Sequence, residues 1–536
     1  MQFEETFDFI VIGAGSTGCV VANRLSEDTE AKVLLLEAGG SDSRPEFHKE
    51  DLKSQLSLYP GQSDWSSNHD WGYCTEPEPY LNGRRIHVAR GKVLGGCSSI
   101  NALMYVRGNP LDYDFWNYLG NEGWSYKDVI PYYKKLEDYE GGGSEFRGTG
   151  GPLSVVNHAD PTPLAYALLN GAKELGYGGS PNWDYNAARQ DGNAFFYQTT
   201  KTRDRHRCST AVAYLNPILE RSNFKVLTKA QVTRLLIEDN RVIGVEYLKN
   251  GTIHCVKAEQ EVIVSGGAYE SPKLLMLSGI GPAEELKAQD ISVVVDLPGV
   301  GKNLQDHLYL GIAYQCKQEI LNPTLVSEAG LFTYTRNGIE FASPDLQIVF
   351  GAVQFVAPEY QREGPGFTFA PVLIQPQSVG SVSLRSNKPS DLAVIRSNYL
   401  ENDADLNVFL KGMDIVRELA HTKAFDDLRG DELAPGAKVT SKSELSEFIR
   451  NNCTTLWHPV GTCKMGYDKY AVVDPQLRVH GIEGLRVADA SIMPRIIAGN
   501  TNAPCIMIGE KVADMIKTSD RQKVTDLNSF NHQLTH

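Results

Sequence analysis

Short apolar runs separated by a glycine-rich turn characterise the first forty residues. Residues 7–12 (FDFIVI) read as a buried strand, and glycines cluster in residues 13–18 directly after it. Apolar positions then recur at helical spacing over residues 19–25, and residues 32–36 form a second strand-like run. This order predicts a βαβ unit, and a parallel sheet is the expected consequence.

The same kinds of pattern return later in the chain. Strand-like runs are predicted at residues 225–227, 234–237, 242–247, 261–265, 346–350 and 380–384. Helical spacing is predicted over residues 403–420 and 505–516, and residues 485–516 form a last compact αβ region. Strands and helices alternate near both ends of the chain, and a long middle section, about residues 308–448, separates these regions. This arrangement predicts a discontinuous first domain with a second domain inserted into it.

Composition and charge narrow the class of protein. The 536 residues include 52 Lys and Arg against 66 Asp and Glu, a net charge of −14, which disfavours nucleic-acid binding. No apolar stretch approaches the ~18 residues of a membrane span, although peripheral membrane association stays open. The N-terminus lacks the basic region of a secretory signal. The nine cysteines follow no metal-binding rhythm, so we expect reduced thiols, no metal site and a cytoplasmic location.

The glycine turn fits the dinucleotide-binding fingerprint GxGxxG. Gly13 permits the tight turn, Gly15 lets a pyrophosphate approach the backbone and Gly18 allows close helix–strand packing. Glu37 ends the second predicted strand, where a carboxylate can accept hydrogen bonds from ribose hydroxyls, which disfavours NADP. The fingerprint alone does not separate FAD from NAD.

Five ordered segments resemble those of the glucose–methanol–choline (GMC) oxidoreductases. They are GKVLGGCSSIN (91–101), GAYESP through SGIG (267–281), PGVGKNLQDH (298–307), WHPVGT (457–462) and GNTNAP (499–504). The likeness spans residues 7–516 and is nearest to the choline-dehydrogenase-like and the short-chain alcohol or hydroxymethylfurfural oxidase-like branches. It implies an α/β fold in which a Rossmann-like FAD-binding domain carries an inserted α+β substrate-binding domain.

The resemblance also implies domain boundaries and cofactor contacts. It places the FAD-binding domain at residues 1–155, 203–307 and 455–520, the substrate-binding domain at 156–202 and 308–454, and a flexible tail at 521–536. Some family members bind FAD covalently through a histidine, but Ile100 stands at that position, so we expect non-covalent FAD. The expected cofactor-binding residues are Gly13, Gly15, Ser16, Thr17, Gly18, Glu37, Ala38, Trp71, Arg90, Val93, Gly95, Gly96, Ser98, Asn101, Ala102, Leu103, Met104, Val232, Trp457, Asp489, Ala490, Asn502, Ala503 and Pro504.

By the same resemblance, His458 is the catalytic base and Asn502 its partner. A histidine suits proton removal because its unperturbed pKa is about 6.5. An amide can hold the substrate oxygen but cannot accept its proton. Asn502 is also expected to cap a helix whose N-terminus points at the flavin. His307 is expected to have a structural hydrogen-bond role.

The sequence therefore predicts an FAD-dependent oxidoreductase that converts a primary alcohol to an aldehyde and passes electrons to oxygen or a quinone. The aromatic residues Phe350, Phe355 and Tyr360 suit an apolar or aromatic alcohol, although core packing is the preferred interpretation for them. A choline enzyme would need a carboxylate or an aromatic cage for the ammonium group. Hydroxynitrile lyase, fatty-acid photodecarboxylase and a flavin-binding protein without turnover are the alternatives; His458 argues against the photodecarboxylase.

Overall fold

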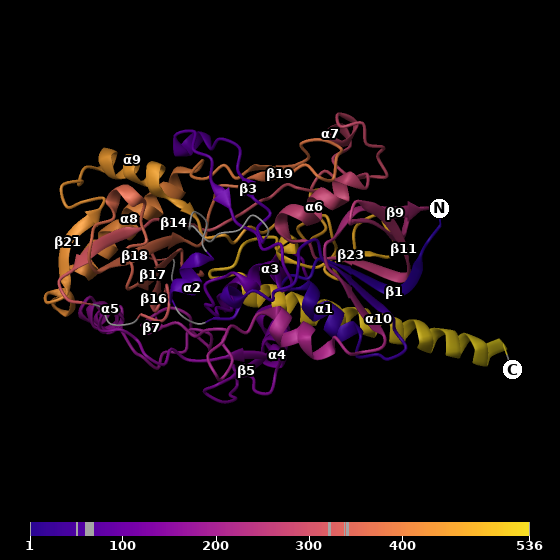
Figure 1. The fold of residues 1–536 in the computed structure, drawn as a ribbon, viewed down its shortest axis with the longest axis horizontal. Coiled ribbons are helices and arrows are strands. Elements are labelled where there is room, and N and C mark those ends of the chain that lie inside the picture. Colours follow the sequence, from indigo (N-terminus) through magenta and orange to yellow (C-terminus); the bar gives the residue numbers. More distant parts are fainter. Residues whose placement is uncertain are drawn as a thin grey trace.

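The protein has two lobes, each built around its own sheet, and a long C-terminal helix that projects from one of them (Figure 1). The structure is a computed structural model that describes residues 2–49, 52–58, 69–319, 323–336, 338 and 342–534, the last sixteen of these by backbone alone. The two lobes meet along the segments that form the candidate site described below.

The first sheet begins with the predicted βαβ unit. Strands β1 (Glu5–Ile12) and β2 (Val33–Leu36) pair in parallel and flank helix α1 (Gly18–Leu25). Every residue of β2 is buried, as expected for a strand with both faces covered. The strand order is β8-β2-β1-β11-β10-β9, and β23 (Leu485–Val487) pairs in parallel with β11.

The outer strands of this sheet form an antiparallel meander. Strands β9 (Ala230–Glu238), β10 (Arg241–Lys249) and β11 (Thr252–Val264) run antiparallel to one another, whereas β8 (Phe224–Leu227) pairs in parallel with β2. Helix α6 (Gly267–Leu277) follows β11 and packs against β9. Strand β23 joins the sheet from the C-terminal region, so this domain is discontinuous in sequence.

The second sheet is antiparallel and lies in the other lobe (Figure 1). Its order is β21-β15-β18-β17-β16-β7, and β14 (Leu308–Tyr309) pairs with both β18 and β22 (Thr454–Thr455). Its other strands are β7 (Ala194–Phe196), β15 (Ile312–Cys316), β16 (Ala329–Thr333), β17 (Leu346–Gly351), β18 (Gly366–Leu373) and β21 (Arg429–Ala434). Helices α5 (Pro163–Glu174) and α8 (Asp403–Ala420) pack against it, and α9 (Lys442–Asn452) packs on α8.

Short elements complete the fold. They are β3 (Tyr73–Cys74), β4 (His87–Val88), β5 (Glu137–Tyr139), β6 (Leu153–Val155), β12 (Ile280–Gly281), β13 (Val295–Asp296), β19 (Ser381–Ser383), β20 (Val394–Arg396), and the helices α2 (Leu52–Ser57), α3 (Pro110–Tyr118), α4 (Tyr126–Leu136) and α7 (Ala283–Lys287). All the helices and strands predicted from the apolar pattern are present, with ends that move by a few residues; β11 is longer than expected because it continues into the meander.

Helix α10 (Asn502–Leu534) is longer than the helical pattern predicted at residues 505–516. Asn502 is its first residue rather than its cap, and the helix runs through most of the segment expected to be a flexible tail; residues 535 and 536 lie outside the described residues. The sequence-based division into domains stays a prediction at its boundaries. Strand β22, for example, ends at Thr455 and belongs to the second sheet.

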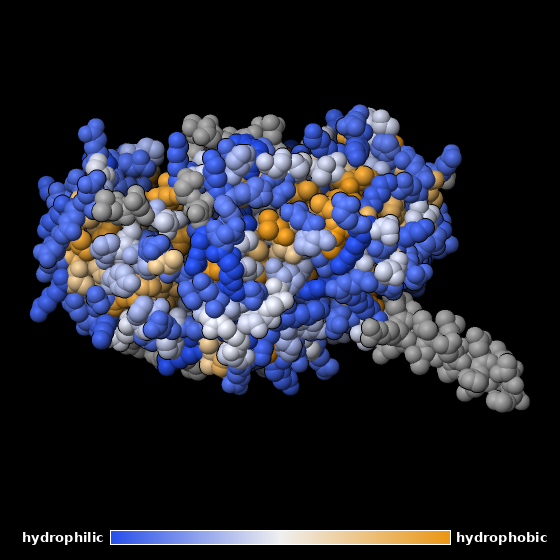
Figure 2. Space-filling model, turned by 60° about the horizontal axis from the view of Figure 1, so that its bottom comes forward, coloured by the Kyte–Doolittle hydropathy of each residue, from blue (hydrophilic) through white to orange (hydrophobic). Residues whose placement is uncertain are grey.

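The face drawn in Figure 2 is largely hydrophilic, with apolar patches over both lobes. Within the described part of the chain, no helix combines the length and the apolar character needed to cross a membrane. All nine cysteines are free thiols.

Candidate active site

The glycine-rich turn between β1 and α1 is packed tightly on one side and open on the other. A Cβ on Gly18 would lie 1.9 Å from the carbonyl oxygen of Gly13, so no side chain fits there. A Cβ on Gly15 would meet nothing within 4 Å. Glu37 accepts hydrogen bonds from the backbone N–H groups of Ala14 (2.8 Å) and Gly39 (2.7 Å), and burial raises its pKa to about 7. The turn therefore presents open backbone toward a cavity.

One cavity runs from this turn to the second sheet, and most of the predicted cofactor residues line it. These are Gly13, Gly15, Ser16, Thr17, Glu37, Ala38, Trp71, Arg90, Gly96, Asn101, Ala102, Leu103, Met104, Val232, Trp457, Asp489, Ala490 and Asn502. Ile100, which stands at the position of the covalent histidine, lines it as well. The residues come from at least six separate segments of the chain.

Six of the predicted cofactor residues do not line the cavity. They are Gly18, Val93, Gly95, Ser98, Ala503 and Pro504. Val93 and Ala503 are buried in the core, and the hydroxyl of Ser98 donates to the Gly95 carbonyl (2.6 Å) inside the loop. We infer that these residues support the residues that line the cavity. A family motif does not show which of its residues contact the cofactor and which support them.

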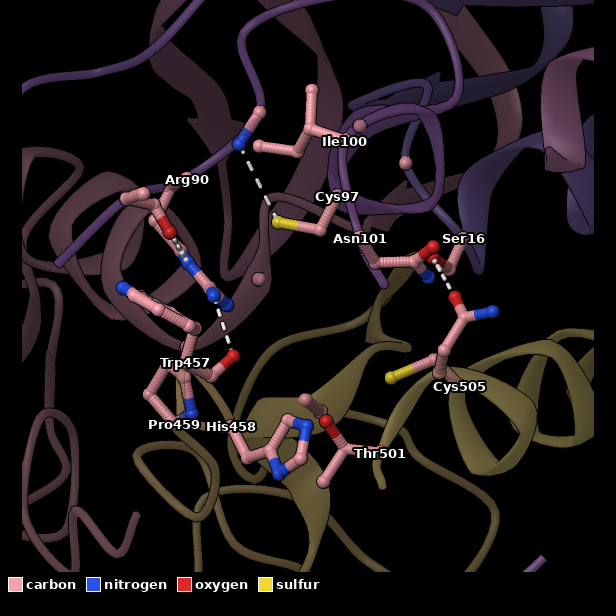
Figure 3. A pocket seen from close by; sticks show the side chains of 18 of the residues that line it. Ser16, Arg90, Cys97, Ile100, Asn101, Trp457, His458, Pro459, Thr501 and Cys505 are labelled. Atoms are coloured by element: carbon pink, nitrogen blue, oxygen red, sulfur yellow. Dashed lines mark hydrogen bonds between the residues drawn. The ribbon is translucent and has the colours of Figure 1, made fainter. Parts of the chain in front are cut away.

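Asn502 does not face His458. Its side-chain oxygen accepts a hydrogen bond from the Ser16 hydroxyl (2.7 Å), which ties the start of α10 to the glycine-rich turn. In Figure 3, Ser16 lies toward Cys505, away from the ring of His458. The expected pairing of His458 with Asn502 therefore has no support in the geometry, and the physical reason is that Asn502 sits inside the first turn of the helix.

Asn500 takes the place expected for Asn502. Its side-chain Nδ2 lies 3.4 Å from Nε2 of His458, and the residue is 7% exposed in the cavity wall. Ala498, which lies on the same loop just before it, is held at both polar backbone atoms: its N–H donates to Asp112 (2.7 Å), and its carbonyl accepts from Gln190 (2.6 Å). This loop holds Asn500 against the histidine.

His458 is held on the opposite side by residues that precede β14. Its backbone N–H donates to Asp306 (2.8 Å), whose carboxylate also accepts from the hydroxyls of Thr455 (2.6 Å) and Tyr399 (2.6 Å). Nδ1 of His458 lies 3.0 Å from Nδ1 of the fully buried His307. His307 thus contacts the candidate base directly, which goes beyond the structural role expected for it.

Burial and nearby positive charge keep His458 uncharged. Desolvation, then His307 and the Arg90 guanidinium, place the pKa of His458 well below its usual range. Burial also lowers the pKa of His307 to about 3. Arg90 donates to the carbonyls of Ala89 and Trp457, and Figure 3 shows it beside Trp457 and Pro459. A neutral imidazole and a fixed cation therefore share this end of the cavity.

Two cavity residues other than glycine have left-handed backbone conformations. Trp457, directly before His458, has φ of 61°, and Leu103, in the loop expected to meet the flavin, has φ of 68°. Such conformations are uncommon for large side chains and gather at functional sites. At Trp457 the backbone N–H donates to the Thr455 hydroxyl (2.7 Å), which helps to hold the conformation.

The aromatic residues singled out in the middle section separate into two groups. Phe350 is fully buried against other phenylalanines, and Tyr360 packs on Phe448, so core packing accounts for both. Phe355 lines the cavity, stacked on Tyr309 with ring centroids 5.7 Å apart. Tyr309 and Asn500 were not among the expected site residues. The position of Tyr309 depends on the two-residue pairing of β14 with β22, and that of Asn500 on where α10 begins; neither leaves a periodic signal.

The cavity fits FAD. The open side of Gly15 leaves room for a diphosphate, and Glu37 lies at the same end for a ribose. At the other end the side-chain oxygen of Asn500 and the hydroxyl of Tyr269 are buried without a hydrogen-bond partner among the described residues, and both line the cavity. Buried polar atoms of this kind point to a ligand that completes them.

A βαβ fingerprint and a buried, uncharged histidine in one continuous cavity are typical of a dinucleotide-dependent oxidoreductase. The chain belongs to the GMC oxidoreductases, whose N-terminal and C-terminal regions match residues 7–309 and 376–509. It is 42% identical to the oxygen-dependent choline dehydrogenase of Brucella canis over 537 aligned positions, which cover 95% of each chain.

Solved structures agree with this assignment. Pyridoxine 4-oxidase from Mesorbium loti superposes with a TM-score of 0.88 at 32% identity, over 95% of this chain and 98% of that one. A formate oxidase from Aspergillus oryzae RIB40 superposes with a TM-score of 0.85 at 27% identity, over 97% and 100% of the two chains. The predicted family, the α/β fold with its two domains and the class of FAD-dependent alcohol oxidoreductase are confirmed.

Proposed function

We propose that the protein oxidises a primary alcohol to an aldehyde at the end of the cavity where His458 and Asn500 meet. The observation that carries this proposal is the pair of contacts on the His458 ring, Asn500 at Nε2 and His307 at Nδ1. Bound FAD, held without a covalent link, supplies the acceptor for the hydride that leaves the alcohol carbon. The chain itself removes the hydroxyl proton and holds the oxygen.

The contact with His307 selects the tautomer of His458 that can act as a base. The backbone carbonyls of Ile374 and Ile497 favour a proton on the His307 ring, although neither has ideal hydrogen-bond geometry to Nε2. A proton on Nε2 of His307 leaves its Nδ1 as an acceptor, so His458 donates its own Nδ1–H across the 3.0 Å contact. Nε2 of His458 then carries the lone pair, which faces Asn500 and the cavity.

Asn500 supplies the complementary group. Its amide N–H groups lie beside the same Nε2 atom, so an alcohol oxygen placed between them accepts from Asn500 while its proton passes to His458. The low pKa of His458 keeps the ring neutral at neutral pH, so its lone pair is unprotonated when the alcohol binds. Asn502, bound to Ser16, stays with the cofactor end of the cavity.

Three alanine variants test these roles by anaerobic stopped-flow reduction of the flavin with a primary alcohol. His458→Ala is expected to lower the reduction rate by at least ~10²-fold with FAD still bound. Asn500→Ala is expected to lower it by roughly 10-fold, because it removes one hydrogen bond to the oxygen. Asn502→Ala is the matched control and is expected to weaken FAD binding more than it slows reduction.

The outcomes separate the assignments. An unchanged rate in His458→Ala would refute the base, and a larger rate loss in Asn502→Ala than in Asn500→Ala would restore the pairing expected from sequence. Flavin that bleaches with an alcohol also excludes a lyase, a photodecarboxylase and a flavoprotein without turnover, alternatives that the relatives described above do not support. For the electron acceptor we propose oxygen or a quinone, and the rate of flavin reoxidation in air distinguishes them.

A further inference from the structure

The end of the cavity beside His458 is built mainly from the second sheet, and its side chains are almost all uncharged. Tyr309 comes from β14, Val349 from β17, and Thr368 and Ala370 from β18. Phe355 follows β17 and completes this wall. The part of the substrate that does not react must contact these groups.

The three carboxylates among the described lining residues are Glu37, Glu270 and Asp489, and each already has its own donors. Glu37 accepts from the glycine-rich turn, and Asp489 accepts from the Gly267 N–H (2.8 Å) and the Ser271 hydroxyl (2.5 Å). Glu270 accepts from the Tyr73 hydroxyl and forms an ion pair with Lys273 at 3.1 Å. All three therefore belong to the first domain or its cofactor loops rather than to the wall formed by the second sheet.

The charged side chain that lines the cavity beside the base is Arg90, whereas the Asp306 carboxylate that holds the His458 N–H lies behind the wall. Arg90 lines the cavity and helps to keep His458 uncharged, and it forms no ion pair within 4.0 Å with any described residue. Its guanidinium donates to two backbone carbonyls rather than to a carboxylate, and Asp306 and Asp70 act on it only at longer range, so its positive charge faces the cavity. A cationic substrate would bring a second positive charge into the same desolvated space, which is costly without a counter-charge.

Aromatic rings can also hold a quaternary ammonium group, but only through their faces. Tyr309 and Phe355 stack at 5.7 Å with ring planes 22° apart, so each turns a face toward the other. Trp457 packs on Tyr309 at 6.2 Å. The stacked contact covers one face of each of the two rings, and the three rings give this end of the cavity an aromatic, apolar surface that suits a ring or a branched hydrocarbon.

From this arrangement we propose that the substrate is an uncharged primary alcohol with an apolar or aromatic body, and not choline. The proposal rests on the proposed function and narrows its substrate class. The substrate proposed for this chain therefore differs from choline, the substrate in the name of its Brucella canis relative.

Two matched sets of alcohols test the proposal on the holoenzyme. Choline and 3,3-dimethylbutan-1-ol have the same shape and differ only in a charged nitrogen against a neutral carbon. A second set has benzyl alcohols with trimethylammonium, tert-butyl or carboxylate at the 4-position. Anaerobic flavin reduction is expected to have a second-order rate constant at least ~10-fold higher for the neutral member of each set. Equal or faster reduction by choline, or by either charged benzyl alcohol, would overturn the proposal.

Two variants test the wall itself, whichever alcohol the unsubstituted protein prefers. Phe355→Glu places a carboxylate in the wall, and Phe355→Gln is its uncharged match. The ratio of choline to 3,3-dimethylbutan-1-ol is expected to rise at least ~10-fold in Phe355→Glu relative to Phe355→Gln. An unchanged ratio would show that this wall does not contact the body of the alcohol. If no alcohol in either set bleaches the flavin of the unsubstituted protein, it is the proposed function that fails.

Discussion

Replacing Gly15 by alanine should separate FAD binding from folding. The added Cβ would meet no protein atom within 4 Å, and the backbone of Gly15 does not have the positive φ that disfavours alanine. A compatible Gly→Ala change stabilises a protein by about 0.4–1 kcal/mol, so the apoprotein should be at least as stable as before. The new methyl group instead occupies the space through which a diphosphate approaches the backbone.

The expected size of the effect follows from the contacts that would be lost. A hydrogen bond from a backbone N–H to a charged phosphate contributes about 1.5–3 kcal/mol, so losing one should raise the dissociation constant of FAD roughly 10- to 100-fold. The assay is titration of the deflavinated protein with FAD, followed by flavin fluorescence, with urea unfolding of the apoprotein as the stability measurement.

Two other glycines of the same region serve as controls. Gly40→Ala is also free of contacts within 4 Å, but Gly40 does not line the cavity, so FAD affinity should stay unchanged. Gly18→Ala places its Cβ 1.9 Å from the Gly13 carbonyl oxygen and should prevent folding of the turn. Wild-type FAD affinity in Gly15→Ala would show that the diphosphate does not pass over Gly15, and would refute the placement of the cofactor.

Three further results are expected from the other end of the cavity. Arg90→Gln removes the positive charge beside His458 and should lower the midpoint potential of the flavin by roughly 30 mV or more, about 1.4 kcal/mol for two electrons, in a dye-equilibration titration. Lys92→Gln is the control for a nearby charge, and an equal shift in both would contradict a local role for Arg90. Because the pKa of His458 is lowered, the ring should stay neutral down to pH 6.5. The rate of flavin reduction by alcohol should therefore be constant from pH 8 to 6.5 and fall only below pH 6.5, as the ring is protonated. A fall in the stopped-flow rate that begins above pH 7 would count against this. Asp306→Asn weakens the group that accepts hydrogen bonds from the His458 N–H and from two hydroxyls. It should slow flavin reduction roughly 10-fold at unchanged FAD content and lower the free energy of unfolding, measured in urea, by about 1–3 kcal/mol. A wild-type reduction rate would show that Asp306 does not position the base.

Local sequence predicted the cofactor end of the site because its contacts are local. The glycine-rich turn, Glu37 and the strands on either side lie within forty residues, and the geometry of each is set by its immediate neighbours. The loop at residues 91–104 was similarly recognisable from its motif, although the motif could not show that Val93 and Ser98 face away from the cavity.

The reacting end was harder to predict because long-range pairing assembles it. His307 and His458 are 151 positions apart and meet because β14 pairs with β22, two strands of only two residues each. Asn500 and Asn502 are two positions apart, and their roles depend on where α10 begins. A start at Asn502 places that residue toward Ser16 and leaves Asn500 on the loop that faces His458. Neither the pairing of β14 with β22 nor the first residue of α10 leaves a periodic pattern in the sequence.

The two ends of the cavity are therefore constrained in different ways. The cofactor end depends on backbone atoms and on glycines that tolerate no side chain, such as Gly18, so few substitutions are compatible with FAD binding. The wall from the second sheet contributes side chains such as Tyr309, Val349 and Phe355, which can change without disturbing the strands that carry them. The choice of alcohol can thus change while the cofactor end of the cavity stays the same, and the comparison of choline with its uncharged analogue tests this separation directly.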